Sequence, residues 1–324
     1  MAAITQSVAL FGVTGELGRA FLDGLEEQAA FTGRLRLFAS EKSIEETRLF
    51  RDKPYLIENP DGADFSDVSE AILALPADIA DDLAPRLLAA GVRVWDATGH
   101  LKNLPQAVNI KAQSEHDLLM VCDDALAIAL LPLLQAITEL TTVVAADATV
   151  LLPASLKGRR GVRELASQTG ELLNGRGISP TVWPQQLSFN VLAADGSFER
   201  NGPTLSEKRL QQALQTLLPA LPVLSLRSYV VPVFYGATID LRLTLADKPS
   251  RLALTTALKA VVGLQLHDRA DFRGLPTPVG EGISDQVHVS RLLLEGSEVR
   301  LSVLCDPLRA GLVRSVLDSL LKCS

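Results

Sequence analysis

The feature that most constrains this chain is the alternation, over its first third, of short continuous apolar runs with segments of helical periodicity. Residues 19–28, for example, place Phe21, Leu22 and Leu25 on one side of a helix. Unbroken apolar runs are typical of strands that are buried on both faces. A strand–helix–strand order therefore predicts an α/β fold with a parallel sheet and right-handed crossovers. Five runs of strand type lie at residues 7–11, 35–39, 71–75, 93–97 and 118–122.

The pattern changes after residue 124, and 324 residues are enough for a second domain. Residues 125–140 are predicted to form a long apolar helix that breaks or restarts near Pro132, and residues 141–152 form a long β-branched stretch. Strands gathered together, with helices set apart, predict an α+β domain with a mixed or antiparallel sheet. Further strands are expected at 228–235, 238–245, 286–294 and 299–304, and helices at 160–174, 206–217, 250–261 and 308–321.

The charge distribution argues against a nucleic-acid partner. The net charge is −7, whereas a nucleic-acid surface needs clustered basic side chains. The one basic run, residues 157–160, either holds an anion or forms the solvated start of a helix.

The sequence also predicts a cytoplasmic protein without a membrane partner. Residues 1–7 contain no positively charged segment followed by an apolar stretch, so they do not resemble a signal peptide. Asp147 interrupts the longest apolar run, at residues 143–152, which is too short to span a membrane. The three cysteines lie far apart in the sequence, which predicts neither a disulfide framework nor a metal-binding pair.

A glycine-rich turn lies between the first predicted strand and the first predicted helix. Its G-x-x-G-x-x-G spacing lets the backbone approach a pyrophosphate, whose charge is met by amide groups at the helix start. The alternative is a tight turn without a ligand. The carboxylate of Glu16 opposes binding, because it lies on the first helical turn. The predicted cofactor contacts in this turn are Gly12, Thr14, Gly15, Glu16, Leu17 and Gly18.

The residues after the second predicted strand bear on the choice of cofactor. Ser40, Lys42 and Ser43 are suited to meet the 2′-phosphate of NADP, whereas Glu41 opposes it. The segment therefore gives a mixed signal for the choice between NAD and NADP, and the expectation is NADP binding that is weak or lost.

Several segments, in the correct order along nearly the whole chain, resemble bacterial aspartate-semialdehyde dehydrogenases, and in particular the Usg-like subgroup. The resemblance implies a Rossmann-like NAD(P)-binding domain at residues 1–124 plus 307–324, to which the final helix returns. It also implies an α+β dimerisation domain at 125–306 and a homodimer formed through it. The segments are 12–18 with 38–43, 189–190 with 198–202, 232–236, 276–278 with 284–285 and 289–291, and 306–311.

The resemblance also implies where the family's chemistry would lie. In the family, a cysteine thiolate attacks the carbonyl, hydride passes to or from NADP, and a histidine accepts and returns the proton. Arginines hold the carboxylate and phosphate of the substrate. In this chain the cysteine position falls on Ala125, the histidine position on Ala237 and a substrate-binding arginine position on Val230. A methyl group cannot accept a proton, and an isopropyl group cannot pair with a carboxylate.

Cys122 offers an alternative nucleophile, because a small gap in the alignment would place it at the cysteine position. It ends an apolar run and precedes two aspartates, which raise the pKa of a neighbouring thiol. A buried structural cysteine is therefore the favoured interpretation. None of the four histidines has a position that the family uses as a base, and His288 is predicted to lie on a strand surface.

Other positions depart from the family in the same direction. Lys102 replaces the phosphate-binding arginine, Leu152 an acyl-positioning glutamine, and Pro307 the asparagine that holds the nicotinamide. Removing one member of a catalytic unit costs ~10⁴-fold in rate. We predict a catalytically inactive, dimeric dehydrogenase relative. The alternatives are an active NADP-dependent, acyl-phosphate-forming aldehyde oxidoreductase that uses Cys122, and a pure interaction protein with a vestigial glycine turn.

Overall fold

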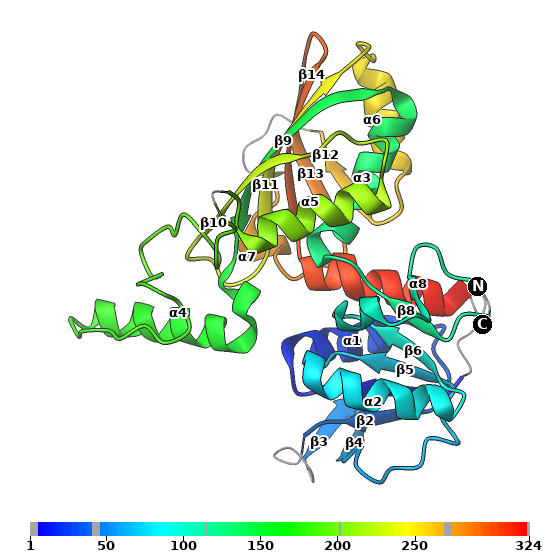
Figure 1. The fold of residues 1–324 in the computed structure, drawn as a ribbon. Coiled ribbons are helices and arrows are strands. Elements are labelled where there is room, and N and C mark those ends of the chain that lie inside the picture. The colour runs from blue at the N-terminus through cyan, green and yellow to red at the C-terminus, as the bar shows by residue number, and fades with distance from the viewer. Residues whose placement is uncertain (1–5, 41–45, 115, 201, 269–273, 323–324) are drawn as a thin grey trace. The chain divides into compact units, whose positions relative to one another are not determined.

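The computed structural model describes residues 6–40, 46–114, 116–200, 202–268 and 274–322. The chain divides into two compact units, the first made of residues 1–125 with 312–324 and the second of residues 126–311. Each unit is built on its own sheet (Figure 1). No helix within the described ranges is long and apolar enough to cross a membrane.

The first unit contains an eight-stranded sheet in the order β3-β4-β2-β1-β5-β6-β8-β7. All neighbours pair in parallel except β3 with β4. Its strands are β1 (Val8–Phe11), β2 (Leu35–Phe38), β3 (Thr47–Phe50), β4 (Lys53–Glu58), β5 (Glu70–Leu73), β6 (Arg93–Asp96), β7 (Ala107–Asn109) and β8 (Leu119–Val121). The five predicted strands are confirmed. The sequence missed β3, β4 and β7, which lack an unbroken buried run.

Helices of the first unit come from both ends of the chain. They are α1 (Glu16–Glu27), α2 (Ala77–Ala89), the 3₁₀ helix η2 (His100–Asn103) and α8 (Arg314–Lys322). α8 and the residue before it pack closely on α1, since a Cβ added to Gly24 would lie 2.6 Å from Val313 and 3.1 Å from Leu317 of α8. The final helix therefore packs on the first unit, as the family resemblance implies for the NAD(P)-binding domain.

The predicted single helix over 308–321 is wrong in its first half. A π-helical segment, η5 (Pro307–Val313), precedes α8. Asp306 starts this segment, since its carboxylate accepts the amide of Leu308 at 3.0 Å. The apolar spacing that predicted the helix lies mainly at residues 312–321, so it could not reveal a wider turn before them.

The second unit contains a six-stranded mixed sheet in the order β10-β9-β11-β14-β13-β12. Its strands are β9 (Val143–Leu152), β10 (Ser225–Val230), β11 (Ala237–Leu245), β12 (Leu264–His267), β13 (Val287–Glu295) and β14 (Glu298–Cys305). The central pairs are antiparallel, and the edge strands β10 and β12 pair in parallel. The predicted mixed sheet is confirmed. The strand expected at 228–235 instead ends at Val230, because Pro232 has no amide to donate to a sheet.

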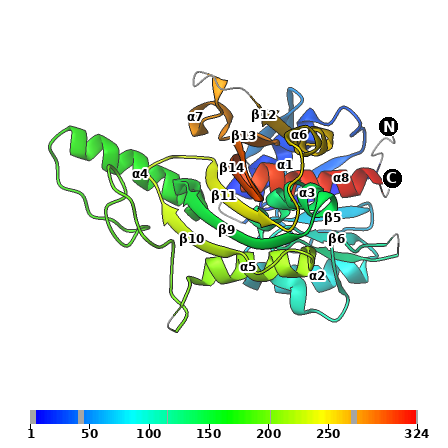
Figure 2. The ribbon, with the colours of Figure 1, turned by 90° about the horizontal axis from the view of Figure 1, so that it is seen from above.

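The strands curve around three helices, α3 (Ala125–Leu140), α5 (Leu205–Leu217) and α6 (Arg251–Ala260) (Figure 2). One apolar core joins these helices to alternate strand residues such as Ile239, Leu241 and Val303. The predicted break of α3 at Pro132 is wrong, since the helix is continuous. A proline inside a helix costs about 3 kcal/mol, and burial of most of the α3 side chains outweighs that cost.

Helix α4 (Gly158–Leu173) projects away from the six-stranded sheet together with the loop that follows it (Figure 2). It starts directly after the 3₁₀ helix η3 (Ala154–Lys157). A small separate apolar cluster joins the base of this projection to the end of β10. Its members are Ala154, Leu165, Trp183, Leu187, Leu192 and Val230.

Candidate functional site

The glycine turn connects β1 to α1. At two of its positions, Gly12 and Gly18, the backbone leaves no room for a side chain. Gly12 has φ +83°, and a Cβ there would lie 2.2 Å from the carbonyl oxygen of Ala74. A Cβ on Gly18 would lie 2.1 Å from the carbonyl oxygen of Gly12. Any larger residue would displace backbone at either position. These two glycines therefore give no independent sign of a ligand.

Gly15 differs from its two neighbours in the turn. It is exposed and has φ −74°, and an added Cβ would meet only the Gly12 carbonyl oxygen, at 3.3 Å. As the N-cap of α1 it offers no side chain to the first helical amides, so its lack of a Cβ leaves them open to a phosphate. The turn therefore has room for a pyrophosphate at Gly15. The carboxylate of Glu16, in the first turn of α1, would repel the phosphate charge.

The other predicted cofactor residues are only partly described. Thr14, Glu16 and Leu17 are half-buried in the turn, and Ser40 is exposed directly after β2. Lys42 and Ser43 lie outside the described residues.

Cys122 follows β8 and has 3% of its surface exposed. Its amide donates to the carbonyl oxygen of Asp96 at 2.9 Å. Burial raises the pKa of its thiol far above the usual range, the charges of Asp96 and Asp123 raise it further, and Lys111 opposes them. At neutral pH the sulfur is therefore a protonated thiol, whereas a nucleophile needs the thiolate.

Lys102, the predicted anion-binding residue, is exposed on η2. The loop that carries it is organised by the fully buried carboxylate of Asp96, a residue that the sequence analysis missed. Asp96 accepts the amide and hydroxyl of Thr98 at 2.9 and 2.6 Å, and the amide of Leu101 at 2.8 Å. The Asp-x-Thr spacing is typical of such a local turn and was available as a signal.

Ala237, where the family resemblance predicts a histidine, begins β11 and is fully buried in the core of the second unit. It lies opposite Cys305 of β14. Burial raises the pKa of the Cys305 thiol to about 12, with Asp306 adding to the effect. The side chains at this pair of positions are therefore a methyl group and a neutral thiol, and neither accepts a proton at neutral pH.

Val230, where the family resemblance predicts an arginine, ends β10 and is also fully buried. It pairs with Leu152 of β9, and its amide and carbonyl exchange two 2.9 Å hydrogen bonds with Leu192. Trp183 and Leu187 complete the apolar cluster around it. The Val230 side chain therefore serves as packing within this cluster.

The prediction that His288 lies on a strand surface is wrong, because only 4% of it is exposed. It pairs with Leu304, which in turn pairs with Thr238. Directly paired residues share a face of the sheet, and successive residues alternate between faces. His288 thus lies on the face of Thr238, opposite to that of Ala237. It therefore does not place an imidazole beside Ala237.

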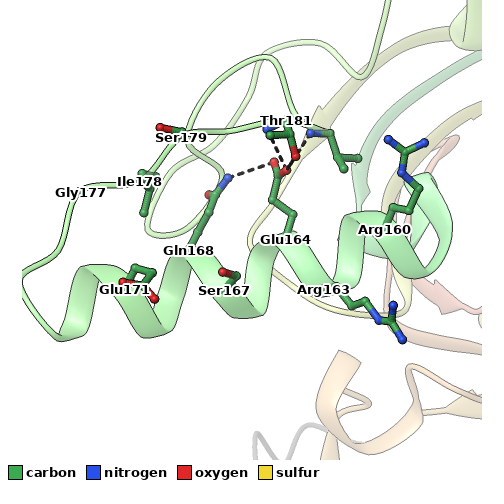
Figure 3. A pocket seen from close by; sticks show the side chains of 11 residues that line it. Arg160, Arg163, Glu164, Ser167, Gln168, Glu171, Gly177, Ile178, Ser179 and Thr181 are labelled. Atoms are coloured by element: carbon green, nitrogen blue, oxygen red, sulfur yellow. Dashed lines mark hydrogen bonds between the residues drawn. The ribbon is translucent and has the colours of Figure 1, made fainter.

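A cavity of about 450 Å³ lies between α4 and residues 177–182 (Figure 3). Glu164 points from α4 toward this loop, where its carboxylate accepts the amide and hydroxyl of Thr181 at 2.8 and 2.6 Å. It also accepts the amides of Val182 and Trp183, at 2.7 and 3.0 Å. Burial raises the pKa of Glu164, but these hydrogen bonds outweigh it and lower the pKa to about 2. Glu164 therefore fastens the loop to the helix.

The basic run at 157–160 takes part in this region in two ways. Lys157 lies over the ring of Trp183, 6.0 Å from its centroid, and Arg160 lines the cavity. Lys157 thus packs on Trp183, and Arg160 is an exposed cation at the cavity, whereas Arg159 is half-buried.

A parallel sheet with a glycine turn after its first strand, followed by a mixed-sheet unit, defines a two-domain NAD(P)-dependent oxidoreductase architecture. Residues 7–125 match the semialdehyde dehydrogenase NAD binding domain, and residues 130–309 match the semialdehyde dehydrogenase dimerisation domain. The chain belongs to the semialdehyde dehydrogenase family.

Individual relatives agree with this assignment. The chain is 30% identical to a USG-1 protein homolog of Pseudomonas aeruginosa, with 94% of each chain covered. It is 29% identical to aspartate-semialdehyde dehydrogenase 2 of Vibrio cholerae, again with 94% coverage of each. The solved structure of aspartate semialdehyde dehydrogenase II from Vibrio cholerae, complexed with ASA, superposes with a TM-score of 0.90 at 27% identity and 98% coverage of each chain. The predicted family and its Usg-like subgroup are confirmed.

Proposed function

We propose that this protein is a catalytically inactive, homodimeric member of the semialdehyde dehydrogenase family that retains weak NADP binding. The observation that carries the proposal is the burial of Ala237 and Val230 in apolar surroundings. Both side chains serve as packing. The family resemblance predicts a histidine base at the position of Ala237 and an arginine that binds the substrate carboxylate at the position of Val230. Ala125, at the expected cysteine position, adds a third loss.

The alternative, an active NADP-dependent aldehyde oxidoreductase, depends on Cys122. Its burial and the raised pKa of its thiol argue against that role. A catalytic thiolate reacts rapidly with iodoacetamide at neutral pH, whereas a buried protonated thiol does not. We expect Cys122 in the folded protein to stay unlabelled at pH 7 and to be labelled after unfolding in urea.

The test of inactivity is a direct assay with aspartate semialdehyde, NADP and phosphate, monitored by NADPH absorbance. The Vibrio cholerae relative named above serves as the positive control. We expect no turnover above the enzyme-free blank. Turnover that disappears in Cys122→Ser would overturn the proposal and establish the alternative.

Nucleotide binding is proposed on the geometry of the glycine turn. Gly15 leaves the first amides of α1 open, so Gly12, Thr14, Gly15, Glu16, Leu17 and Gly18 would surround the pyrophosphate. NADP would supply the hydride acceptor of the family's reaction, and this chain's residues would only bind and orient it. Ser40, Lys42 and Ser43 would meet the 2′-phosphate, and exposed Lys102 would hold an anion such as phosphate.

Dimerisation is proposed through the second unit, which matches the family's dimerisation domain. Two kinds of surface support a second copy as the partner. The six-stranded sheet has a face without core contacts, which carries Asp240 and Arg242 on β11. The segment after α4 also exposes large apolar side chains, Phe189 at 66% and Phe198 at 64%. Apolar side chains that gather on one surface of a soluble protein mark an interaction site.

Size-exclusion chromatography with light scattering tests the dimer. We expect a mass of twice 34.8 kDa for the wild type. Phe198→Glu is expected to shift the population toward monomer, and Leu252→Glu, at an exposed apolar position on α6, is the control. A wild-type monomer at micromolar concentration would contradict the proposal.

A further inference from the structure

Three side chains in the second unit form one hydrogen-bonded chain, which we name the histidine clasp. Nδ1 of His288, on β13, lies 3.1 Å from Nε2 of His267 at the end of β12. On its other side, Nε2 of His288 lies 3.2 Å from the Oγ atom of Ser284, in the loop between α7 (Pro278–Glu281) and β13. The histidine clasp therefore joins two strands and a loop.

The geometry indicates that the two imidazoles share a proton. The ring centroids are 5.4 Å apart, which is nearly as far as the 3.1 Å nitrogen separation allows, so the rings lie end to end. Two imidazole ligands of one metal ion would instead direct their lone pairs to a common point off the line between them. One nitrogen donates and the other accepts, which requires at least one neutral ring.

Ser284 has a structural place in the clasp. Its hydroxyl oxygen accepts the amide of Gln286 at 3.1 Å, which closes the turn that enters β13. The hydroxyl proton is then directed to Nε2 of His288, and the proton on Nδ1 of His288 is directed to His267. In this arrangement both nitrogens of the neutral His288 ring are hydrogen-bonded: Nδ1 donates to His267 and Nε2 accepts from Ser284.

The parts joined by the clasp pack on the turn that leads to Ala237. A Cβ on Gly236 would lie 2.8 Å from the Cα atom of Gly282, and a Cβ on Gly282 would lie 2.9 Å from the carbonyl oxygen of Tyr235. The other joined element, β12, is an edge strand whose sheet neighbour is β13. An edge strand is held by one ladder of hydrogen bonds, which for β12 covers four residues, so a side-chain tie at its last residue adds to that attachment.

The charges that act on His288 come from all three neighbouring elements. Burial lowers the pKa of His288 and the charge of His267 lowers it further, while Glu281 of α7 and Asp285 of the following loop raise it. Because the folded-state pKa is depressed, the folded protein takes up this proton less readily than the unfolded chain. The contribution of the clasp to stability is therefore complete above the unfolded pKa of about 6.5 and is lost as the pH falls below it.

We propose that the histidine clasp is a pH-operated switch. While one ring is neutral, the shared proton holds β12 and the α7 loop to β13. When both rings carry a positive charge, two N–H groups face each other, the hydrogen bond breaks, and the edge strand and the loop detach. The turn at residues 235–236 then loses the loop that packs on it.

Amide hydrogen exchange of the full-length protein, followed by mass spectrometry at pH 7.5 and pH 5, tests the switch. Protection factors, which correct for the intrinsic pH dependence of exchange, are expected to fall at least tenfold at pH 5 in peptides covering 264–268 and 282–290. Peptides from β9 should stay unchanged. Equal protection at the two pH values in the wild type would overturn the proposal without any variant.

Two variants assign the effect to the clasp. In His267→Gln the amide oxygen still accepts the His288 proton but the second imidazole is removed, so two cationic rings can no longer face each other and the loss of protection at pH 5 should disappear. The control is His116→Gln, which removes an exposed histidine from the first unit and should behave as the wild type. A pH-dependent loss that persists in His267→Gln would also overturn the proposal.

Discussion

The glycine turn of the first unit and the Ala237–Val230 region of the second differ in what the fold demands of them. Gly12 and Gly18 must be glycines, because a Cβ at either position would collide with backbone. The fold makes no comparable demand for a histidine at position 237 or an arginine at position 230, and apolar residues pack well there. The glycines of a nucleotide-binding turn can therefore be retained for steric reasons alone, whether or not catalytic residues are retained elsewhere. Only Gly15, which the turn does not require, points to a ligand.

The strongest test of this comparison separates the three glycines. Gly18→Ala should lower the free energy of unfolding of the first unit by about 3 kcal/mol or more, because its Cβ would overlap the Gly12 carbonyl. Gly15→Ala should cost less than about 1 kcal/mol but abolish NADP binding. Urea denaturation followed by Trp95 fluorescence in a Trp183→Phe background measures the first unit, since each unit contains one tryptophan. Equal costs for the two substitutions would break the distinction.

The second test introduces an arginine at position 230, where the family resemblance predicts one. Val230→Arg should destabilise the second unit by about 3–5 kcal/mol and leave activity at the blank, because a charge would be buried among apolar side chains. Trp183 lies in the same cluster, so its fluorescence in a Trp95→Phe background reports the change. Val230→Ile is the control and should cost less than about 1.5 kcal/mol. A stable Val230→Arg protein would mean that the site still accommodates an arginine of the kind that binds a substrate carboxylate.

The third test concerns Glu164, which fastens the loop beside the Val230 cluster. Glu164→Gln should lower stability at pH 7 by about 1–2 kcal/mol, since hydrogen bonds to a carboxylate weaken on neutralisation. The pKa of Glu164 is lowered to about 2, so its contribution is present above the unfolded value of about 4.3 and is lost as the pH falls toward 2. The difference between wild type and variant in urea should thus shrink between pH 5 and pH 2.5. Glu171→Gln, in an exposed pair with Arg176, should change stability by less than about 0.5 kcal/mol.

The smallest expected effect tests the opposition between Glu16 and phosphate. Glu16→Gln should tighten NADP binding by about 0.5–1 kcal/mol, because it removes a like charge from the helix start. Isothermal titration calorimetry gives the dissociation constant, and Glu27→Gln, at the far end of α1, is the matched control. Weaker binding by Glu16→Gln would show that the carboxylate contacts the cofactor favourably.

The sequence predicted the elements whose burial is local and uniform. β1 and β5 are buried at every residue, so their unbroken apolar runs were enough. Exposed β3 and β4 carry no such run. Helix α3 passes through Pro132 because the surrounding core, which the sequence does not show, compensates the lost hydrogen bond.

The candidate site was less predictable than the fold. The family resemblance located Ala237 and Val230, but their burial comes from neighbours distant in sequence, such as Cys305 and Leu192. The exposure of His288 was predicted wrongly for the same reason, since β12 and the α7 loop cover it. Glu164 was missed because its partners lie 17 to 19 residues along the chain.

The packing of α8 on α1 has a consequence for biosynthesis. The contact between Gly24 and Val313 cannot form until the whole of the second unit has been synthesised. At about 5–20 residues per second, the delay on the ribosome is on the order of 15–60 s. During that time the surface of α1 at Gly24 is uncovered, and the second unit, although synthesised later, has all of its residues first. Folding of this chain is therefore expected to run against the order of translation, with the amino-terminal unit closing last.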